Sequence, residues 1–366
     1  MNALTLFSSP RGRRRGAAGC SLLCLLLLLT SCTKEQIFPL ASGRPYEVLV
    51  VLDHKTWNAP SGRALFDILD TDVPCLPQSE RSFHITQIEP KDFSANFTIF
   101  RNIIQVNIDK TQFSRAGMSF MRNKYAMDQI VLTINSPSEE EFRKFCINYK
   151  QDVIDFLTRS EMNRLIKELE KKYSKVTYEL AWQIFSCHFH APKELTNYKK
   201  GEHFLWTSNN TASGMMNICI YSYPYEGPET FNKEYMTAKR DSIMKVNLPG
   251  EKPGMYMKTD TLCTMIKPIV VHKRYAMEMR GLWYMEHDAM GGPFVSHSRI
   301  DTETNRVVVA EGFVYAPEKM KRGLIRRLEG SLYTLLLPEE QYSLIDTGIE
   351  ETPSTNASKG GEKKSK

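Results

Sequence analysis

The chain has 366 residues, of which 42% are hydrophobic and 25% are charged, a composition that supports one large or two ordinary folded domains. The formal net charge of +6 includes four arginines between residues 11 and 15, and it falls to +2 when residues 1–31 are left out. Nucleic-acid binding needs a clustered basic surface, so this balance excludes nucleic acid as an expected partner.

The start of the chain has the pattern of an export signal. Residues 11–15 are basic, and residues 17–29 form an apolar stretch shorter than the ~20 residues that span a bilayer as a helix. The stretch ends in the sequence LTSC at residues 29–32, with a branched apolar residue, two small residues and a cysteine. This tetrapeptide resembles a bacterial lipobox.

The lipobox resemblance implies a role for Cys32. In lipoproteins of this type the cysteine carries fatty acyl chains such as palmitate, and the chain is cut just before it. We therefore predict a lipoprotein signal peptide at residues 1–31, a lipid on Cys32 that holds the protein to a membrane, and a tether at residues 32–44. The alternative is a secretory signal that is simply cleaved, with Cys32 an ordinary cysteine.

The other cysteines of the mature chain do not indicate a disulfide framework or a zinc site, because their number is odd and no CxxC pair occurs. Most lie among apolar residues and are predicted to be small core side chains, although one disulfide among them remains open. We expect no metal and no cofactor. These cysteines are Cys75, Cys146, Cys187, Cys219 and Cys263.

Residues 45–175 are predicted to form a first α+β unit. Residues 46–52 read YEVLVVL, an apolar run typical of a strand buried on both faces. Ser138 and Glu141 form a capping box that starts a helix with an apolar face, and a second helix is expected from Ser160. Further strands are expected at residues 83–88, 102–108 and 129–134, and a helix at residues 60–69.

Residues 176–340 are predicted to form a second unit of similar size. The fold class is therefore α+β, with two mixed units of mostly antiparallel sheet and packed helices. Residues 350–366 lack periodicity and are predicted to be a disordered tail. In the second unit, strands are expected at residues 183–190, 203–207, 215–223, 269–284 and 306–315, and helices at residues 231–245 and from Pro317.

Two polar clusters are candidates for metal binding or catalysis, although a structural role is favoured for both. His188 and His190 face the same side of a predicted strand, so they supply only two of the ligands that a metal site needs. The second cluster could add a ligand or acid–base groups, but the glycines that follow it predict a hairpin turn. It consists of Glu286, His287 and Asp288. No nucleophile elbow, HExxH motif or phosphate-binding loop occurs, so no catalytic residue is assigned.

Aromatic residues are the candidates for ligand binding in the second unit. Exposed rings would form a stacking platform for a sugar or a peptide, whereas buried rings would belong to the core, which is the commoner outcome. The candidate residues are Trp206, Tyr223, Tyr225, Trp283 and Phe294.

Four segments of the second unit are specific enough for comparison with known families. They are residues 231–242, RGLW at 280–283, MGGPFVS at 290–296 and EGFVYAP at 311–317. Together they resemble a family of Bacteroidota lipoproteins that is catalogued as a domain of unknown function, and the resemblance extends over about residues 45–337. It implies a lipoprotein of the outer membrane in a Bacteroides-type cell, on either the periplasmic or the outer face, and it implies no activity.

These observations lead to two main functional hypotheses. The favoured one is a non-enzymatic envelope lipoprotein that binds a glycan, a peptide or another envelope protein through the second unit. The alternative is a periplasmic or surface hydrolase that uses His188, His190 and residues 286–288, with or without the help of a metal ion. A third hypothesis is a structural module that presents a protein-binding surface.

Overall fold

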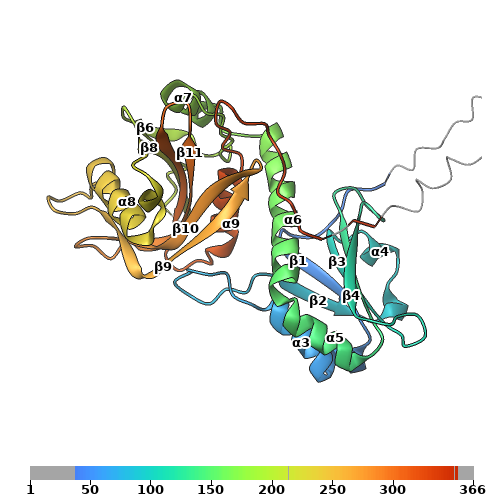
Figure 1. Cartoon of the computed structure of the whole chain (residues 1–366). Coiled ribbons are helices and arrows are strands. Elements are labelled where there is room, and N and C mark those ends of the chain that lie inside the picture. The colour runs from blue at the N-terminus through green and yellow to red at the C-terminus, as the bar shows by residue number, and fades with distance from the viewer. Residues whose placement is uncertain (1–37, 213, 350, 353–366) are drawn as a thin grey trace, which may run out of the picture. The chain divides into compact units, whose positions relative to one another are not determined.

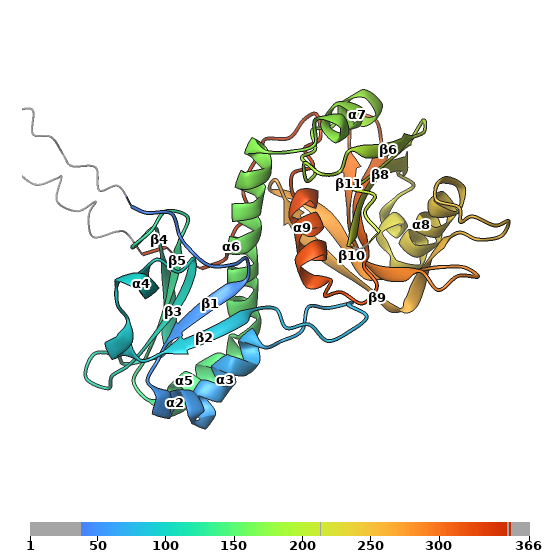
Figure 2. The same ribbon diagram turned by 180° about the vertical axis from the view of Figure 1, so that it is seen from behind.

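Two β-sheets with packed helices make up the computed structural model, which describes residues 38–212, 214–349 and 351–352 (Figures 1 and 2). The first sheet has the strand order β2-β1-β3-β5-β4, and the second has the order β6-β7-β8-β12-β11-β10-β9. Among the described residues, seven of the ten strand pairs are antiparallel. The prediction of an α+β protein with two mixed units is confirmed.

The first sheet is built around strands that are buried on both faces. Val48 and Val50 of β1 share a core with residues of α3 and α5, whereas Leu49 and Val51 pack on the opposite face. The pairings of β1 with β2 and β3, and of β3 with β5, are parallel, and only β4 is antiparallel to its neighbour. Central parallel strands have this continuous apolar pattern. The strands are β1 (Glu47–Val51), β2 (His84–Ile88), β3 (Asn102–Ile108), β4 (Gly117–Arg122) and β5 (Ile130–Ser136). The helices are α2 (His54–Asn58), α3 (Pro60–Leu69), η2 (Pro90–Asp92), α4 (Ala95–Thr98), α5 (Glu139–Asn148) and α6 (Lys150–Lys171).

The second sheet is antiparallel throughout its described strands and is covered by a helix on each face (Figure 1). Ile218 and Ile220 of β8 share a core with residues of α9, whereas Cys219 and Tyr221 share a core with residues of α8. Alternate side chains of one strand thus enter two different cores. The strands are β6 (Asn197–Lys200), β7 (Phe204–Ser208), β8 (Met215–Pro224), β9 (Met257–Val271), β10 (Arg274–Met285), β11 (Gly291–Asp301) and β12 (Arg306–Tyr315). The helices are α7 (Lys175–Phe185), η3 (Pro228–Phe231), α8 (Lys233–Asn247) and α9 (Arg322–Leu332).

The structure corrects several of the predicted elements. The strand predicted at residues 269–284 is interrupted by a turn at His272 and Lys273, which separates β9 from β10. The helix that starts after Ser138 ends at Asn148, and α6 then runs without interruption through Ser160, so no helix begins there. Ser160 is buried on the inner face of α6, where its small size, and not its capping ability, suits the packing. Residues 183–190 are not a strand, because α7 places Leu180, Ala181 and Phe185 in the core at helical spacing.

Several predictions concern residues at the two ends of the chain. The signal peptide, Cys32 and most of the tether lie outside the described residues. In the predicted tail at residues 350–366, Glu351 forms a β-bridge with Phe120, and the Thr352 N–H donates to the Phe120 carbonyl at 2.8 Å. No helix in the described ranges is long and apolar enough to cross a membrane.

Candidate functional site

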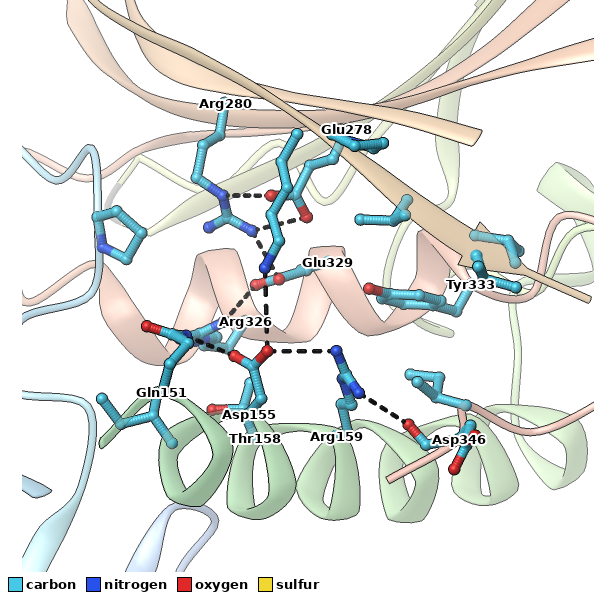
Figure 3. Close-up of a pocket in the computed structure, with 18 of the residues that line it drawn as sticks. Gln151, Asp155, Thr158, Arg159, Glu278, Arg280, Arg326, Glu329, Tyr333 and Asp346 are labelled. Atoms are coloured by element: carbon cyan, nitrogen blue, oxygen red, sulfur yellow. Dashed lines mark hydrogen bonds and ion pairs between the residues drawn. The ribbon is translucent and has the colours of Figure 1, made fainter. Parts of the chain in front are cut away.

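A cavity of about 1070 Å³ is lined by α6, α9, β9 and β10, by residues 343–346, and by part of the segment at residues 71–82 (Figure 3). Sites for drug-sized ligands enclose about 300–1,000 Å³, so this volume suits a large ligand or a short stretch of polypeptide. Acidic and basic groups line it in equal number. They are Asp72, Asp155, Glu278, Glu329 and Asp346, and Arg159, Lys267, Lys273, Arg280 and Arg326.

A buried ion network forms one wall of the cavity. Arg280 of β10 donates from Nε to Glu278 at 3.0 Å and from Nη2 to Glu329 of α9 at 2.6 Å, and Arg326 donates to the other Glu329 oxygen at 2.9 Å (Figure 3). Burial would raise the pKa of Glu278, but the charges of Arg280 and His297 outweigh burial and hold that pKa below its usual range. The Glu278 carboxylate is therefore charged at neutral pH.

A second group of polar side chains extends along α6. Asp155 accepts hydrogen bonds from Gln151 at 2.6 Å and from Arg159 at 3.2 Å, and Lys267 of β9 lies 3.9 Å from the same carboxylate (Figure 3). Arg159 also donates to the Asp346 carbonyl at 3.2 Å. Because these side chains are more exposed than the Arg280 network, they can rearrange around a ligand at lower cost.

Three polar atoms of the cavity lining have no hydrogen-bond partner among the described residues. They are Thr158 Oγ1 on α6, Arg326 Nε on α9 and Nε2 of His272. Arg326 is only 6% exposed, so its Nε cannot be satisfied freely by bulk water. Buried polar groups in native proteins are nearly always paired. The cavity therefore offers a donor and a hydroxyl to a polar ligand.

The backbone of β9 contributes unpaired groups as well. This strand is outermost in the second sheet, and its residues 265–271 line the cavity. Pro268 lies opposite Met277 and has no N–H to donate to β10. It therefore occupies a non-hydrogen-bonded position of the antiparallel pair, where the backbone polar groups point away from β10. By alternation, the N–H and C=O groups of Ile266 and Val270 also point away from β10, and they have no backbone partner in the described part of the chain.

The five predicted ligand-binding aromatic residues lie in or against the core on the α8 face of the second sheet. Tyr223, Trp283 and Phe294 are buried, and Trp206 and Tyr225 are partly buried against the same core. The Trp283 Nε1–H donates to the Val314 carbonyl at 3.3 Å. These rings do not form an exposed platform, because α8 covers the strands that carry them.

His188 and His190 face the same side, as predicted, but they belong to a cluster of five aromatic rings. His188 Nδ1 lies 2.7 Å from Tyr178 Oη, and both histidine rings stack on the Tyr178 ring. No group of three or more potential metal ligands occurs among the described residues. The cluster consists of Tyr173, Tyr178, Trp182, His188 and His190. The ring centroids are 4.5 Å apart for Tyr173 and His190, 5.2 Å for Tyr173 and Tyr178, 5.6 Å for Tyr178 and His190, 5.5 Å for Tyr178 and His188, and 4.9 Å for Trp182 and His188. The four-residue spacing of Tyr178 and Trp182 on α7 was the sequence signal for it.

The Glu286-His287-Asp288 cluster forms the turn between β10 and β11. His287 has a φ of 62°, Asp288 is exposed, and Glu286 lies 3.5 Å from Lys258. None of the three residues lines the cavity at α6 and α9. The sequence reasoning also missed the cavity itself, whose lining comes from segments about 270 residues apart in the chain.

Comparison with known families gives two matches. Residues 41–170 match the family described as Domain of unknown function (DUF8532), and residues 174–334 match Domain of unknown function (DUF4837). The chain thus carries two domains of unknown function. The first match covers the five-stranded sheet with its helices, and the second covers the seven-stranded sheet. No curated protein and no solved structure matches the chain.

Proposed function

We propose that the protein is a lipid-anchored lipoprotein of the outer membrane in a Bacteroidota cell, and that its cavity binds an extended peptide segment of another envelope protein. The anchor is supported by the basic and apolar segments that precede the LTSC sequence at residues 29–32. The binding role is non-enzymatic. The observation that carries it is the large cavity lined by the unpaired edge of β9.

A peptide suits the chemistry of the cavity better than a glycan does. Sugars are usually held by the flat faces of aromatic rings, and Tyr333 is the only Phe, Trp or Tyr residue in the lining of the cavity described above. A peptide carries alternating apolar and charged side chains, and the lining combines paired charges with Ile154, Ile269 and Val270. Its backbone can also pair with the free N–H and C=O groups of β9.

The binding proposal is tested at Val270, whose side chain is 65% exposed and whose N–H points away from β10. A phage-displayed library of random heptapeptides is selected on the full-length protein, and enriched sequences are synthesised and measured by fluorescence anisotropy. Val270→Pro removes the side chain and the N–H, whereas Val270→Ala removes only the side chain. We expect Val270→Pro to weaken binding at least tenfold, about 1.4 kcal/mol or more, and Val270→Ala to change it little.

Circular dichroism of both variants checks that the fold is retained. Equal peptide affinity for the wild type and a folded Val270→Pro variant would exclude pairing with β9. Failure of the library to yield any binding sequence would exclude the peptide class altogether.

The anchor is tested by expressing the full chain in a Gram-negative host and measuring its intact mass and its membrane partition. Cys32→Ala should remove the acyl mass and either release the protein or leave it unprocessed, because the acceptor thiol is lost. Cys24→Ala is the matched control, since it changes a cysteine within the apolar stretch and should leave lipidation intact. If wild type and Cys32→Ala are both soluble and cut at the same bond, the chain is a secreted protein without a lipid.

A further inference from the structure

Two thiols from distant parts of the chain come close together beside the cavity. Cys75 lies between α3 and β2, and its Sγ is 3.1 Å from the carbonyl oxygen of Cys263 in β9 and 3.8 Å from that of Arg280. Cys75 is partly buried and Cys263 is exposed. Pro74, which precedes Cys75, and Arg280, whose carbonyl lies near the Cys75 Sγ, both line the cavity.

We propose that Cys75 and Cys263 form a disulfide bond that ties the segment at residues 70–83 to β9. An upper limit on the distance between the Cα atoms of Cys75 and Cys263 follows from the path that joins them through the Cys75 Sγ and the Cys263 carbonyl. That path is at most about 8 Å long, so the two Cα atoms are closer than this. Disulfides join Cα atoms about 4.4–6.8 Å apart, and the exposed Cys263 side chain is free to rotate toward Cys75.

The segment that carries Cys75 is already held in place on the second domain. Glu80 accepts hydrogen bonds from the N–H groups of Lys321 and Arg322 at 2.7 and 2.8 Å, and Leu76 packs against the core on the α9 face. The Cys75 thiol is therefore presented to β9 without a rearrangement of the backbone. The disulfide would fix the position of the segment at residues 70–83 relative to β9, next to Arg280.

The remaining described cysteines cannot compete for this bond. Cys146, Cys187 and Cys219 are buried, and burial raises the pKa of the Cys146 and Cys187 thiols to about 12. A thiol with so high a pKa is rarely ionised, and the thiolate is the form that attacks a disulfide.

The oxidation is a thiol–disulfide exchange. The Cys263 thiolate attacks the disulfide of an oxidised donor, the Cys75 thiolate displaces the donor sulfur, and the donor leaves as a dithiol with the two electrons and two protons. In the cell the donor is an exported disulfide oxidoreductase, so this step rests on the envelope location proposed above. In vitro, oxidised glutathione serves the same purpose.

The test uses full-length protein that is reduced, equilibrated with oxidised glutathione, treated with iodoacetamide and digested with trypsin. A disulfide joins the tryptic peptide of residues 64–81 to that of residues 259–273, which stays intact at Lys267 because Pro268 follows it. We expect this linked pair in the wild type and in the control Cys146→Ser, and its loss in Cys75→Ser and Cys263→Ser. Oxidation should also raise the urea midpoint of the wild type, but not that of the two Ser variants.

The possible outcomes test the Cys75–Cys263 pairing separately from the proposed envelope location. If Cys75 and Cys263 are both fully alkylated in folded, glutathione-treated wild type, the proposal is overturned. A linked pair in vitro that is reduced in freshly lysed cells supports the pairing and counts against an oxidising envelope compartment. A linked pair in both samples supports the pairing and the location together.

Discussion

The two domains bury polar side chains in different ways. In β3 and β5 of the first domain, the buried polar residues Asn102 and Ser136 stand at strand ends, while the buried interior positions are apolar. In the second domain, Glu311 and Glu278 lie within strands and are paired with buried arginines. The second domain therefore depends on matched charges to a degree that the first does not.

Each face of the second sheet has its own ion network. On the α8 face, Arg240 binds Glu311, and the Arg240 guanidinium also lies 4.1 Å from the centre of the Phe294 ring. On the α9 face, Arg280 binds Glu278 and Glu329. The four strand and helix residues Arg240, Glu311, Glu278 and Arg280 are buried and have little access to water, so each of these charges needs a partner within the fold.

The largest effect should follow from breaking the Arg240–Glu311 pair. Both residues are almost fully buried, and Arg240→Met leaves the Glu311 carboxylate without its cation. We expect a loss of about 3–5 kcal/mol in the free energy of unfolding, measured by urea denaturation. The double variant Arg240→Met/Glu311→Leu should be more stable than Arg240→Met, because it leaves no buried charge.

The first domain provides the matched comparison for this prediction. Glu161 of α6 is bound by Arg101 at 2.8 Å, by Arg164 at 2.7 Å and by Asn102 at 2.6 Å, so Arg101→Met leaves two partners in place. We expect this variant to lose about 1 kcal/mol. Equal losses for Arg101→Met and Arg240→Met would show that the two domains do not differ in their reliance on paired charge.

A smaller effect should follow from removing the helix cap that the first domain gives to the second. Glu80 caps α9, whose own N-terminal residues provide no side-chain cap. Glu80→Ala leaves two N–H groups unsatisfied and should lower the stability of the second domain by about 2 kcal/mol. Limited proteolysis of the Ala variant should cut near α9 earlier than in the wild type.

Ser138 is the matched control within the first domain. Its hydroxyl accepts the Glu141 N–H at 3.2 Å, and Ser138→Ala should cost about 1 kcal/mol and leave the proteolysis of α9 unchanged. If Glu80→Ala leaves the α9 cleavage rate unchanged, the cap contributes nothing to the stability of that helix.

These two caps also show what can be predicted from a sequence. Half of the predicted Ser138 capping box is confirmed: the Ser138 hydroxyl accepts the Glu141 N–H within one helical turn, whereas the Glu141 carboxylate binds Lys144. The Glu80 cap joins residues 241 positions apart, and no local pattern indicates it. The same reason explains the candidate site. Strand and helix patterns are local and yielded the fold class, whereas the cavity is assembled from α6, β9, β10 and α9, which only the tertiary structure brings together.

The aromatic residues show a second limit of the same kind. Composition places many rings in the second domain, but it cannot tell which of them a helix will cover. Trp283 and Phe294 are beneath α8, whereas Trp182 of α7 is 50% exposed and stacks on His188. Burial of a strand face depends on where a helix docks, and that position is set by contacts distant in sequence.

The smallest expected effect concerns acid and the hairpin between β9 and β10. His272 is buried there, its Nδ1 lies 3.1 Å from the Ser343 nitrogen and 3.2 Å from the Ser343 carbonyl oxygen, and its neighbours include Arg299 and the Tyr342 ring. Burial, together with the charge of Arg299, lowers the pKa of His272 from 6.5 to about 4. Between pH 6.5 and pH 4, His272 binds a proton in the unfolded chain but not in the folded protein. The contribution of neutral His272 to the free energy of unfolding is therefore complete above pH 6.5 and is lost as the pH falls toward 4.

The variant His272→Asn separates this effect from the rest of the acid response. His272 and Lys273 have φ values of 49° and 62°, and Asn is favoured in a two-residue turn of this kind, so the hairpin should be retained. Between pH 7 and pH 5, urea denaturation of the wild type should show a loss about 1–2 kcal/mol larger than that of the variant. Equal losses would mean that the burial of His272 contributes nothing to the loss of stability in acid.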